Sequence, residues 1–266
     1  MIVINKKRDW WQMGQGYKLG DLTLDEGMPK VCAPLTGTTL KELLDECGLV
    51  RNSEADLAEW RVDFFEYALD TEKVLEALAK LRQELRCMPL IFSFRTAEEG
   101  GEKNISVRQY IELNKQVAQS GAVQLIDIEL FRGEDTVKEL VAIAKEQQVL
   151  TIISNHDFSQ TPETSEIMSR VEKMLDLGGD IPKVAVMPVK EEDVLTVLQA
   201  NLQLKKSYPN RKMIMIAMGS LGIVTRMSGE IFGSVLTFAA IKHASAPGQV
   251  TANEMKKVLQ IVHNAH

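Results

Sequence analysis

A lysine and a histidine are the residues of this sequence best suited to covalent chemistry. Lys183 lies at the start of the otherwise apolar run IPKVAVMP, where a lysine must pair, reach solvent or react. Reaction requires the neutral amine, which burial and neighbouring cations favour, and Arg61, Arg95 and Arg226 are candidates for those cations. His156 ends the run VLTIISNH, and an imidazole with an ordinary pKa of about 6.5 exchanges protons at neutral pH. A paired lysine and a structural histidine are the alternative interpretation.

Further charged residues end two other strand-like runs. Glu59 and Arg61 lie two apart in EWRVD, so they share one face of a strand and Val62 points to the other. The run SFRTAEEGGE places Arg95 at a strand end and Glu99 in the loop that follows. These side chains are candidate substrate ligands, and an ion pair at the mouth of the fold is the alternative for the first two.

The carboxyl-terminal region offers an anion site. Arg226, Ser245 and Gln249 lie in the loops after the last two predicted strands, where α/β barrels commonly bind anionic groups. An arginine there suits bidentate capture of a carboxylate. The alternative is an arginine on a solvated loop, with the serine and glutamine capping the final helix.

Strand-like and helical segments alternate from residue 31 onward, which is typical of parallel α/β folds. Amphipathic stretches such as TEKVLEALAKLRQEL and SEIMSRVEKMLDL separate the strands. Eight such units predict one (β/α)8 barrel. A doubly wound open sheet is the alternative, but its first turn would usually be glycine-rich, and here that turn reads LTGTTLKE. The eight candidate strands are residues 30–35, 56–63, 89–95, 125–130, 149–156, 183–188, 212–218 and 234–240.

Residues 1–29 precede the first barrel strand and form a predicted extension to a catalytic domain of residues 30–266. Within the extension, VINKKR and DLTLDEG could pair as a short hairpin. We expect this hairpin to close the amino-terminal mouth of the barrel.

Composition excludes several classes of function. The net charge of −6 argues against a nucleic-acid partner. The three cysteines, at wide spacings, match neither a disulfide framework nor a metal site, and indicate a reduced, cytoplasmic protein. With four histidines, metal-dependent chemistry has few ligands. No signal peptide or membrane-length apolar run is present, so we expect no membrane association.

Five motifs together resemble those of the type I 3-dehydroquinate dehydratases. They are EWRVDFF, FSFRTAEEGGE, SNHDF, IPKVAVMP and SGEIFGSVLTFAAIKHASAPGQ, in the family's order and over roughly residues 30–263. The resemblance implies a (β/α)8 barrel, usually a homodimer, that needs no cofactor and dehydrates 3-dehydroquinate in the shikimate pathway.

The resemblance also implies a role for each candidate residue. Lys183 would form the Schiff base, His156 would be the general acid/base, and Glu99 would orient His156. The residues that would hold the ring hydroxyls of the substrate are Glu59, Arg61 and Arg95. Those that would bind its carboxylate are Arg226, Ser245 and Gln249.

Two other functions fit part of the pattern. A class I aldolase would also use a Schiff-base lysine, but it would cleave a carbon–carbon bond and would not require the Glu59, Arg61 and Arg95 group. A catalytically silent barrel that binds a small carboxylate would keep Arg226 but could dispense with Lys183 or His156. This chain has both.

Overall fold

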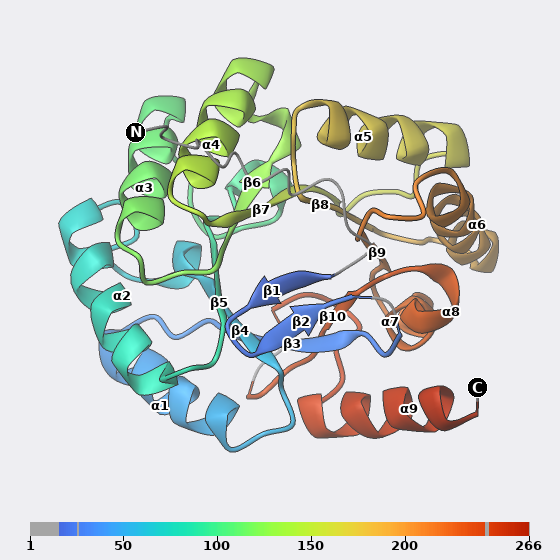
Figure 1. Ribbon diagram of the computed structural model, residues 1–266, viewed down its shortest axis with the longest axis horizontal. Coiled ribbons are helices and arrows are strands. Elements are labelled where there is room, and N and C mark those ends of the chain that lie inside the picture. The colour runs from blue at the N-terminus through green and yellow to red at the C-terminus, as the bar shows by residue number, and fades with distance from the viewer. Residues whose placement is uncertain (1–15, 26, 243–244, 266) are drawn as a thin grey trace, which may run out of the picture.

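The computed structural model describes residues 16–25, 27–242 and 245–265. Eight parallel strands alternate with helices and curl into a barrel (Figure 1). The last strand, β10 (Leu236–Phe238), pairs with the first, β3 (Lys30–Leu35), with Leu236 beside Lys30. An isolated parallel bridge between Met213 and Ser234 joins the remaining edge. The predicted (β/α)8 barrel is confirmed.

All eight predicted strands are present, β3 with the predicted bounds and the others with adjusted bounds. The other six are β4 (Leu57–Arg61), β5 (Leu90–Ser93), β6 (Leu125–Glu129), β7 (Leu150–Asp157), β8 (Ile181–Val186) and β9 (Ile214–Ala217). Strand β5 ends before Arg95, whose backbone N–H points to the carboxylate of Asp63 instead of a strand neighbour. Strand β8 begins two residues earlier than predicted, so Lys183 lies inside the strand.

Helices form the outer layer, and local signals set their starts. Side chains of Thr39, Asp70, Ser106 and Thr251 accept a backbone N–H at the first turn of four helices, which satisfies donors that a helix start leaves free. The helices are α1 (Leu40–Arg51), α2 (Thr71–Leu85), α3 (Val107–Gln119), α4 (Glu134–Glu146), α5 (Thr164–Asp176), α6 (Glu191–Ser207), α7 (Ile223–Met227), α8 (Gly229–Phe232) and α9 (Ala252–Asn264). Three short 3-10 turns follow strands or their loops: η1 (Val62–Phe64), η2 (Ala97–Glu99) and η3 (Leu130–Arg132). None of the described helices is both long and apolar enough to cross a membrane.

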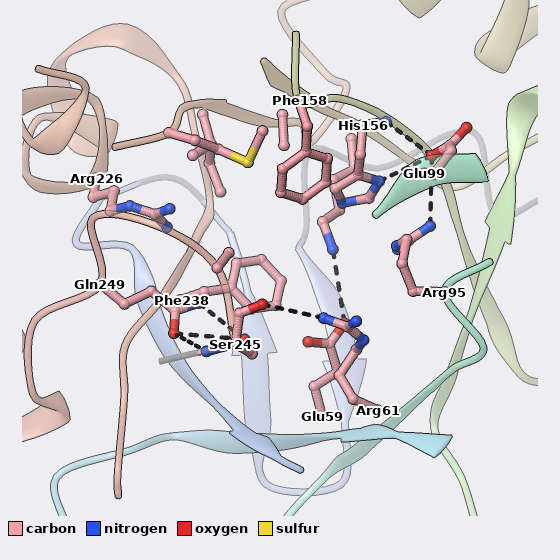
Figure 2. A pocket seen from close by; sticks show the side chains of 15 residues that line it. Glu59, Arg61, Arg95, Glu99, His156, Phe158, Arg226, Phe238, Ser245 and Gln249 are labelled. Carbon is pink, nitrogen blue, oxygen red and sulfur yellow. Dashed lines mark hydrogen bonds and ion pairs between the residues drawn. The ribbon is translucent and has the colours of Figure 1, made fainter. Parts of the chain in front are cut away.

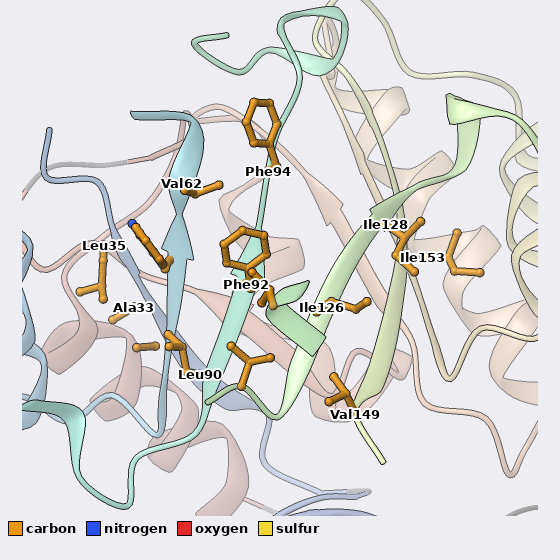
Figure 3. Packing of buried hydrophobic residues seen from close by; sticks show 14 of the residues in the cluster. Ala33, Leu35, Val62, Leu90, Phe92, Phe94, Ile126, Ile128, Val149 and Ile153 are labelled. Atoms are coloured by element: carbon orange, nitrogen blue, oxygen red, sulfur yellow. The ribbon is translucent and has the colours of Figure 1, made fainter. Parts of the chain in front are cut away.

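Side chains alternate between the two faces of each barrel strand. Outward residues such as Trp60, Phe92 and Ile126 join the cluster that packs under the helices (Figure 3). Inward residues near the amino ends, among them Leu57 and Leu125, form a second apolar cluster inside the barrel. Because side chains on a strand alternate with a period of two, the residue two positions after each of these also points into the barrel. It lies closer to the carboxyl end of the strand.

A hairpin covers the amino-terminal end of the barrel, as predicted. Strands β1 (Tyr17–Leu19) and β2 (Leu22–Leu24) are antiparallel, and they lie across the middle of the ring of strands in Figure 1. Leu19 and Leu24 are buried in the inner apolar cluster. The Tyr17 hydroxyl donates to the carbonyl of Asp180, 3.0 Å away, at the base of β8. The first strand is therefore residues 17–19, and the run VINKKR lies outside the described residues.

Candidate active site

One pocket at the carboxyl end of the barrel brings together all nine residues singled out from the sequence. It has about 450 Å³ of empty space, part of it open to solvent. The nine lining residues are Glu59, Arg61, Arg95, Glu99, His156, Lys183, Arg226, Ser245 and Gln249. Apolar side chains, including Phe158 and Phe238, complete its wall (Figure 2).

Lys183 reaches this pocket from the middle of β8 and is 4% exposed. Its Nζ lies 3.4 Å from Asp127 Oδ2 and 3.7 Å from Glu59 Oε1. The ring of Phe238 covers the amine, with its centroid 4.3 Å from Nζ. The sequence suggested arginines around this amine, whereas the ion pairs formed by Nζ are with these carboxylates. Carboxylates and an aromatic face therefore fix the position of the amine.

Arg95 organises the buried carboxylates beneath the pocket. Its Nη1 donates to Glu129 Oε1 at 2.9 Å and to Ser154 Oγ at 3.1 Å, and its Nη2 donates to Asp127 Oδ1 at 2.8 Å. Burial alone would lower the pKa of Arg95, but Asp127, Glu129 and Glu99 raise it well above its usual range. Arg95 is therefore a permanent cation held by protein groups.

Asp127 and Glu129 were not singled out from the sequence. Both are inward residues of β6, at 0% and 1% exposure. Burial opposes ionisation of Asp127, but Arg95 and Lys183 outweigh it and hold the pKa of the Asp127 carboxyl below its usual value. Two carboxylates at alternate positions of the apolar run LIDIEL were the signal that could have revealed them.

Arg61 is held by a third carboxylate that was not singled out from the sequence, that of Asp63. Its Nε and Nη2 donate to the two oxygens of Asp63, each at 2.8 Å. Its Nη1 approaches the carbonyl of Ser245 at 3.4 Å. This bidentate pair fixes the guanidinium plane at the pocket edge and links β4 to the loop after β10.

His156 and Glu99 form a hydrogen-bonded pair. Glu99 Oε2 accepts the backbone N–H of His156 at 2.8 Å and lies 3.0 Å from its Nδ1. Arg95 Nη1 is 3.6 Å from the same oxygen, and Figure 2 shows Glu99 between the imidazole and Arg95. With Nδ1 engaged, Nε2 is the ring nitrogen left for a bound molecule.

Burial shifts the proton affinities of both groups. It lowers the pKa of His156 well below its usual 6.5, and the cations Arg95, Lys183 and Arg61 add to that effect. Burial also raises the pKa of Glu99 to about 8, against the opposing effect of Arg95. At neutral pH the imidazole is therefore neutral, which is the form that a general base needs.

Arg226, on α7, lies across the pocket from His156 (Figure 2). It is 2% exposed, and its Nη2 donates to the carbonyl of Pro247 at 3.0 Å. Its Nε has no hydrogen-bond partner among the described residues. Burial lowers the pKa of Arg226 to about 10, so it stays charged at neutral pH. A buried cation with a free donor is suited to an anionic ligand.

Ser245 and Gln249 lie beside each other near this arginine. Gln249 Oε1 accepts the backbone N–H of Ser245 at 3.0 Å, and Gln249 Nε2 donates to Ser245 Oγ at 3.1 Å. Thr251, and neither of these two residues, caps α9. The pair therefore belongs to the pocket wall, and not to a helix cap.

No group of three or more His, Cys, Asp or Glu residues in the described part of the chain is arranged to hold a metal ion. The groups that converge on the pocket are an amine, an imidazole, carboxylates and guanidinium groups. They can provide a nucleophile, an acid or base, and an anion site.

Comparisons with known proteins agree with this arrangement. The model of the type I 3-dehydroquinase family matches residues 31–266. A 3-dehydroquinate dehydratase of Clostridium botulinum is 50% identical over 91% of this chain and 96% of its own length. One from Bacillus licheniformis is 48% identical over 92% and 97%.

A solved structure shows the same similarity in three dimensions. The crystal structure of a type I 3-dehydroquinate dehydratase from Clostridium difficile has a TM-score of 0.92 and 43% identity, and covers 96% of this chain and 100% of that one. The resemblance inferred from the five motifs is therefore confirmed. The chain belongs to the type I 3-dehydroquinase family and is a hydro-lyase that dehydrates 3-dehydroquinate.

Proposed function

We propose that the enzyme converts 3-dehydroquinate to 3-dehydroshikimate through a Schiff base on Lys183, with His156 as general acid/base. The observation that carries this proposal is the placement of a buried lysine and a neutral imidazole on adjacent strands of one pocket. The β7–β8 register sets His156 beside Ala185, two residues beyond Lys183. The similar C. difficile structure contains covalently modified comenic acid, which supports covalent chemistry for this family.

The chemical task is to remove a proton beside a ketone and to expel a β-hydroxyl group. His156 takes a proton from the Lys183 ammonium group, and the freed amine adds to the ketone carbon. The same proton then leaves with the carbinolamine oxygen as water, which gives an iminium. The iminium withdraws electrons, so Nε2 of His156 can take the adjacent proton and leave an enamine. The enamine expels the β-hydroxyl, which receives that proton and departs as water. A water molecule then hydrolyses the iminium and regenerates the amine.

Glu99 would act through His156. Glu99 Oε2, which already accepts the backbone N–H of His156, also accepts a hydrogen bond from Nδ1–H and so keeps the lone pair on Nε2. This pairing favours the tautomer that can act as a base and restricts rotation of the ring. Glu99 is therefore proposed as the group that orients His156.

The remaining polar residues would hold the substrate. Arg226 is the proposed partner of the substrate carboxylate because it is buried, charged and has a free Nε donor, with Ser245 and Gln249 beside it. Glu59, Arg61 and Arg95 are proposed to hold the ring hydroxyls from the opposite side. Fixing the ring at two ends converts binding energy into orientation of the reacting proton.

Borohydride trapping tests the covalent step directly. The enzyme is incubated with 3-dehydroquinate, reduced, and analysed by intact and peptide mass spectrometry. A stable adduct on the peptide that contains Lys183 is expected. A folded enzyme that turns over substrate but gives no adduct contradicts the Schiff base. An adduct with an aldol substrate that undergoes carbon–carbon cleavage would instead support the aldolase alternative.

We further propose that the enzyme is a cytoplasmic homodimer of the shikimate pathway that uses no cofactor, with residues 30–266 as the catalytic domain. The motif resemblance supports each of these statements. The burial of Cys32 and Cys47 as free thiols is in keeping with a reducing compartment. Light scattering of the purified enzyme should give twice the chain mass of 29.8 kDa.

A further inference from the structure

Phe158 lines two cavities that both reach the His156–Glu99 pair. The first is the active-site pocket. The second, here called the outer cavity, has about 1070 Å³ of empty space that includes open solvent, and Phe131, Arg132 and Arg170 lie on its wall. Phe158, His156 and Glu99 line both cavities. Figure 2 shows the Phe158 ring directly beside the imidazole.

Gly100 explains how the ring is held. It ends η2, the turn that carries Glu99, with φ of +81°, a conformation that favours glycine. A Cβ on Gly100 would overlap the Phe158 ring. The ring therefore lies directly against this backbone and joins the tip of β7 to the turn that positions Glu99.

The exposed fractions follow the same arrangement. Phe158 is 39% exposed, whereas the side chains of His156 and Glu99 are 10% and 8% exposed. The aromatic ring, and not the polar pair, takes most of the contact with solvent on this side.

We propose that Phe158 is a positioning residue whose ring forms part of the wall between the active site and the outer cavity, and limits the contact of outer water with the His156–Glu99 pair. The proposal rests on the acid/base role proposed for His156. It adds a specific function for an apolar side chain that makes no polar contact with the reacting groups.

A change in hydration should move the proton affinity of His156 in a known direction. Burial is the largest cause of its lowered pKa, ahead of the neighbouring cations. Water admitted through the wall would raise that pKa toward the ordinary value of about 6.5. The charged groups that face or adjoin His156 from the packed elements are Glu99 of η2, Arg95 after β5, Arg61 of β4, Lys183 of β8, Asp157 of β7 and Arg170 of α5. Substitution of Phe158 leaves all of these charged groups in place.

The test compares Phe158→Ala with Phe158→Leu and Phe131→Ala. Phe158→Ala opens the wall, whereas Phe158→Leu keeps an apolar filler. Phe131→Ala is the matched control because that ring is 58% exposed and lines the outer cavity without lining the active-site pocket. Two quantities are measured: the pKa of His156, from NMR of histidine-labelled enzyme assigned with His156→Asn, and the pH profile of kcat.

For Phe158→Ala we expect the His156 pKa to rise toward 6.5, and kcat at pH 5.5 to fall to about one tenth of its value at pH 7.5, because a base of that pKa is then mostly protonated. The wild type, Phe158→Leu and Phe131→Ala should keep the low His156 pKa.

An unchanged His156 pKa in folded Phe158→Ala overturns the proposal. If the pKa rises while the kcat profile stays flat, the shielding role stands and the acid/base role of His156 is wrong. Should Phe158→Ala not fold, Gly100→Ala tests the same contact by displacing the ring, and an unchanged His156 pKa there would also overturn the proposal.

Discussion

The two ends of this barrel use the same strands for different purposes. At the amino end, inward residues such as Leu57, Leu125 and Ile181 form an apolar layer sealed by the hairpin. Two residues further along the same strands lie Glu59, Asp127 and Lys183, all inward and all charged. A shift of one strand period thus separates a layer that stabilises the fold from a layer that carries chemistry.

The energetic demands of the two ends are opposite. Each apolar side chain buried at the amino end stabilises the fold by about 1.5–3 kcal/mol. Each charge buried at the carboxyl end costs desolvation energy, which its partners offset only when the geometry is good. The bidentate Arg61–Asp63 pair and the Arg95 contacts meet that condition. Substitutions at the two ends should therefore separate stability from activity.

The largest expected effect is at the charged end. Lys183→Met keeps the length of the side chain but removes the amine, so turnover should fall by at least about 10⁴-fold, the scale seen when a nucleophile is lost. Steady-state kinetics with 3-dehydroquinate would measure it. Lys80→Met, at an exposed position of α2, is the control and should keep full activity. Near-normal turnover in Lys183→Met would mean that the covalent mechanism is wrong.

The apolar end should show the reverse behaviour. Leu125→Ala empties a fully buried position, which should lower the free energy of unfolding by about 2–5 kcal/mol, while kcat of the folded enzyme stays within about twofold. Urea unfolding and kinetics below the transition would measure both. Leu49→Ala, at a position 48% exposed, should change stability by less than about 0.5 kcal/mol. A large loss of kcat in Leu125→Ala would break the separation of the two ends.

Within the charged end, Arg226 should affect substrate binding more than turnover. Arg226→Ala should raise KM by about 10- to 100-fold, because a hydrogen bond to a charged group contributes about 1.5–3 kcal/mol, with a smaller change in kcat. The free energy of unfolding should stay the same or rise, since the substitution removes a buried cation whose Nε has no partner in the described part of the chain. The exposed Arg108 of α3 offers Arg108→Ala as a control. A fall in kcat alone would contradict a binding role.

The last prediction concerns the pH dependence of stability. Because the pKa of Glu99 is raised from 4.5 to about 8 in the folded state, folded protein binds this proton more tightly than unfolded protein, and the Glu99 contribution to stability falls as pH rises through that window. His156 acts in the opposite sense, since its lowered pKa makes its contribution fall as pH drops below about 6.5.

Glu99→Gln removes the contribution of Glu99 to the pH dependence and keeps that of His156. Compared with the wild type, its free energy of unfolding should decline less between pH 5.5 and 8.5 in urea titrations. If the free energy of unfolding changes with pH in the same way in both proteins, Glu99 is ionised over the whole range and its pKa is not raised.

Much of the fold could be read from the sequence, because strand period and strand length leave a direct trace in the pattern of apolar residues. Strand bounds were less accurate, as at Arg95, whose backbone turns toward Asp63 in another strand's loop. The two residues of that contact are far apart in the sequence, so a local sequence pattern cannot predict it. The hairpin was predicted, but with residues 3–8 in place of Tyr17–Leu19.

The candidate site was predictable where a polar residue stood out at a strand end. Its supports were harder to predict. Asp127 and Glu129 pair with Arg95, which follows the neighbouring strand β5, so their importance depends on which strands are neighbours. Asp63 pairs with Arg61 two residues before it, but its contact with the backbone of Arg95 also depends on the fold. Phe158 and Phe238 looked like ordinary apolar residues in the sequence, and their value depends on the polar groups that they cover.

The pairing of the last strand with the first also bears on folding. The active-site residues come from strands and loops spread from β4 to the segment after β10, and they meet when β10 lies beside β3. This closure adds contacts between residues far apart in the sequence, and contacts of that kind form slowly during folding. Catalytic activity is therefore a late signal during refolding, because a chain that has formed its strand–helix units only up to β8 still lacks the side of the pocket that carries Arg226, Ser245 and Gln249.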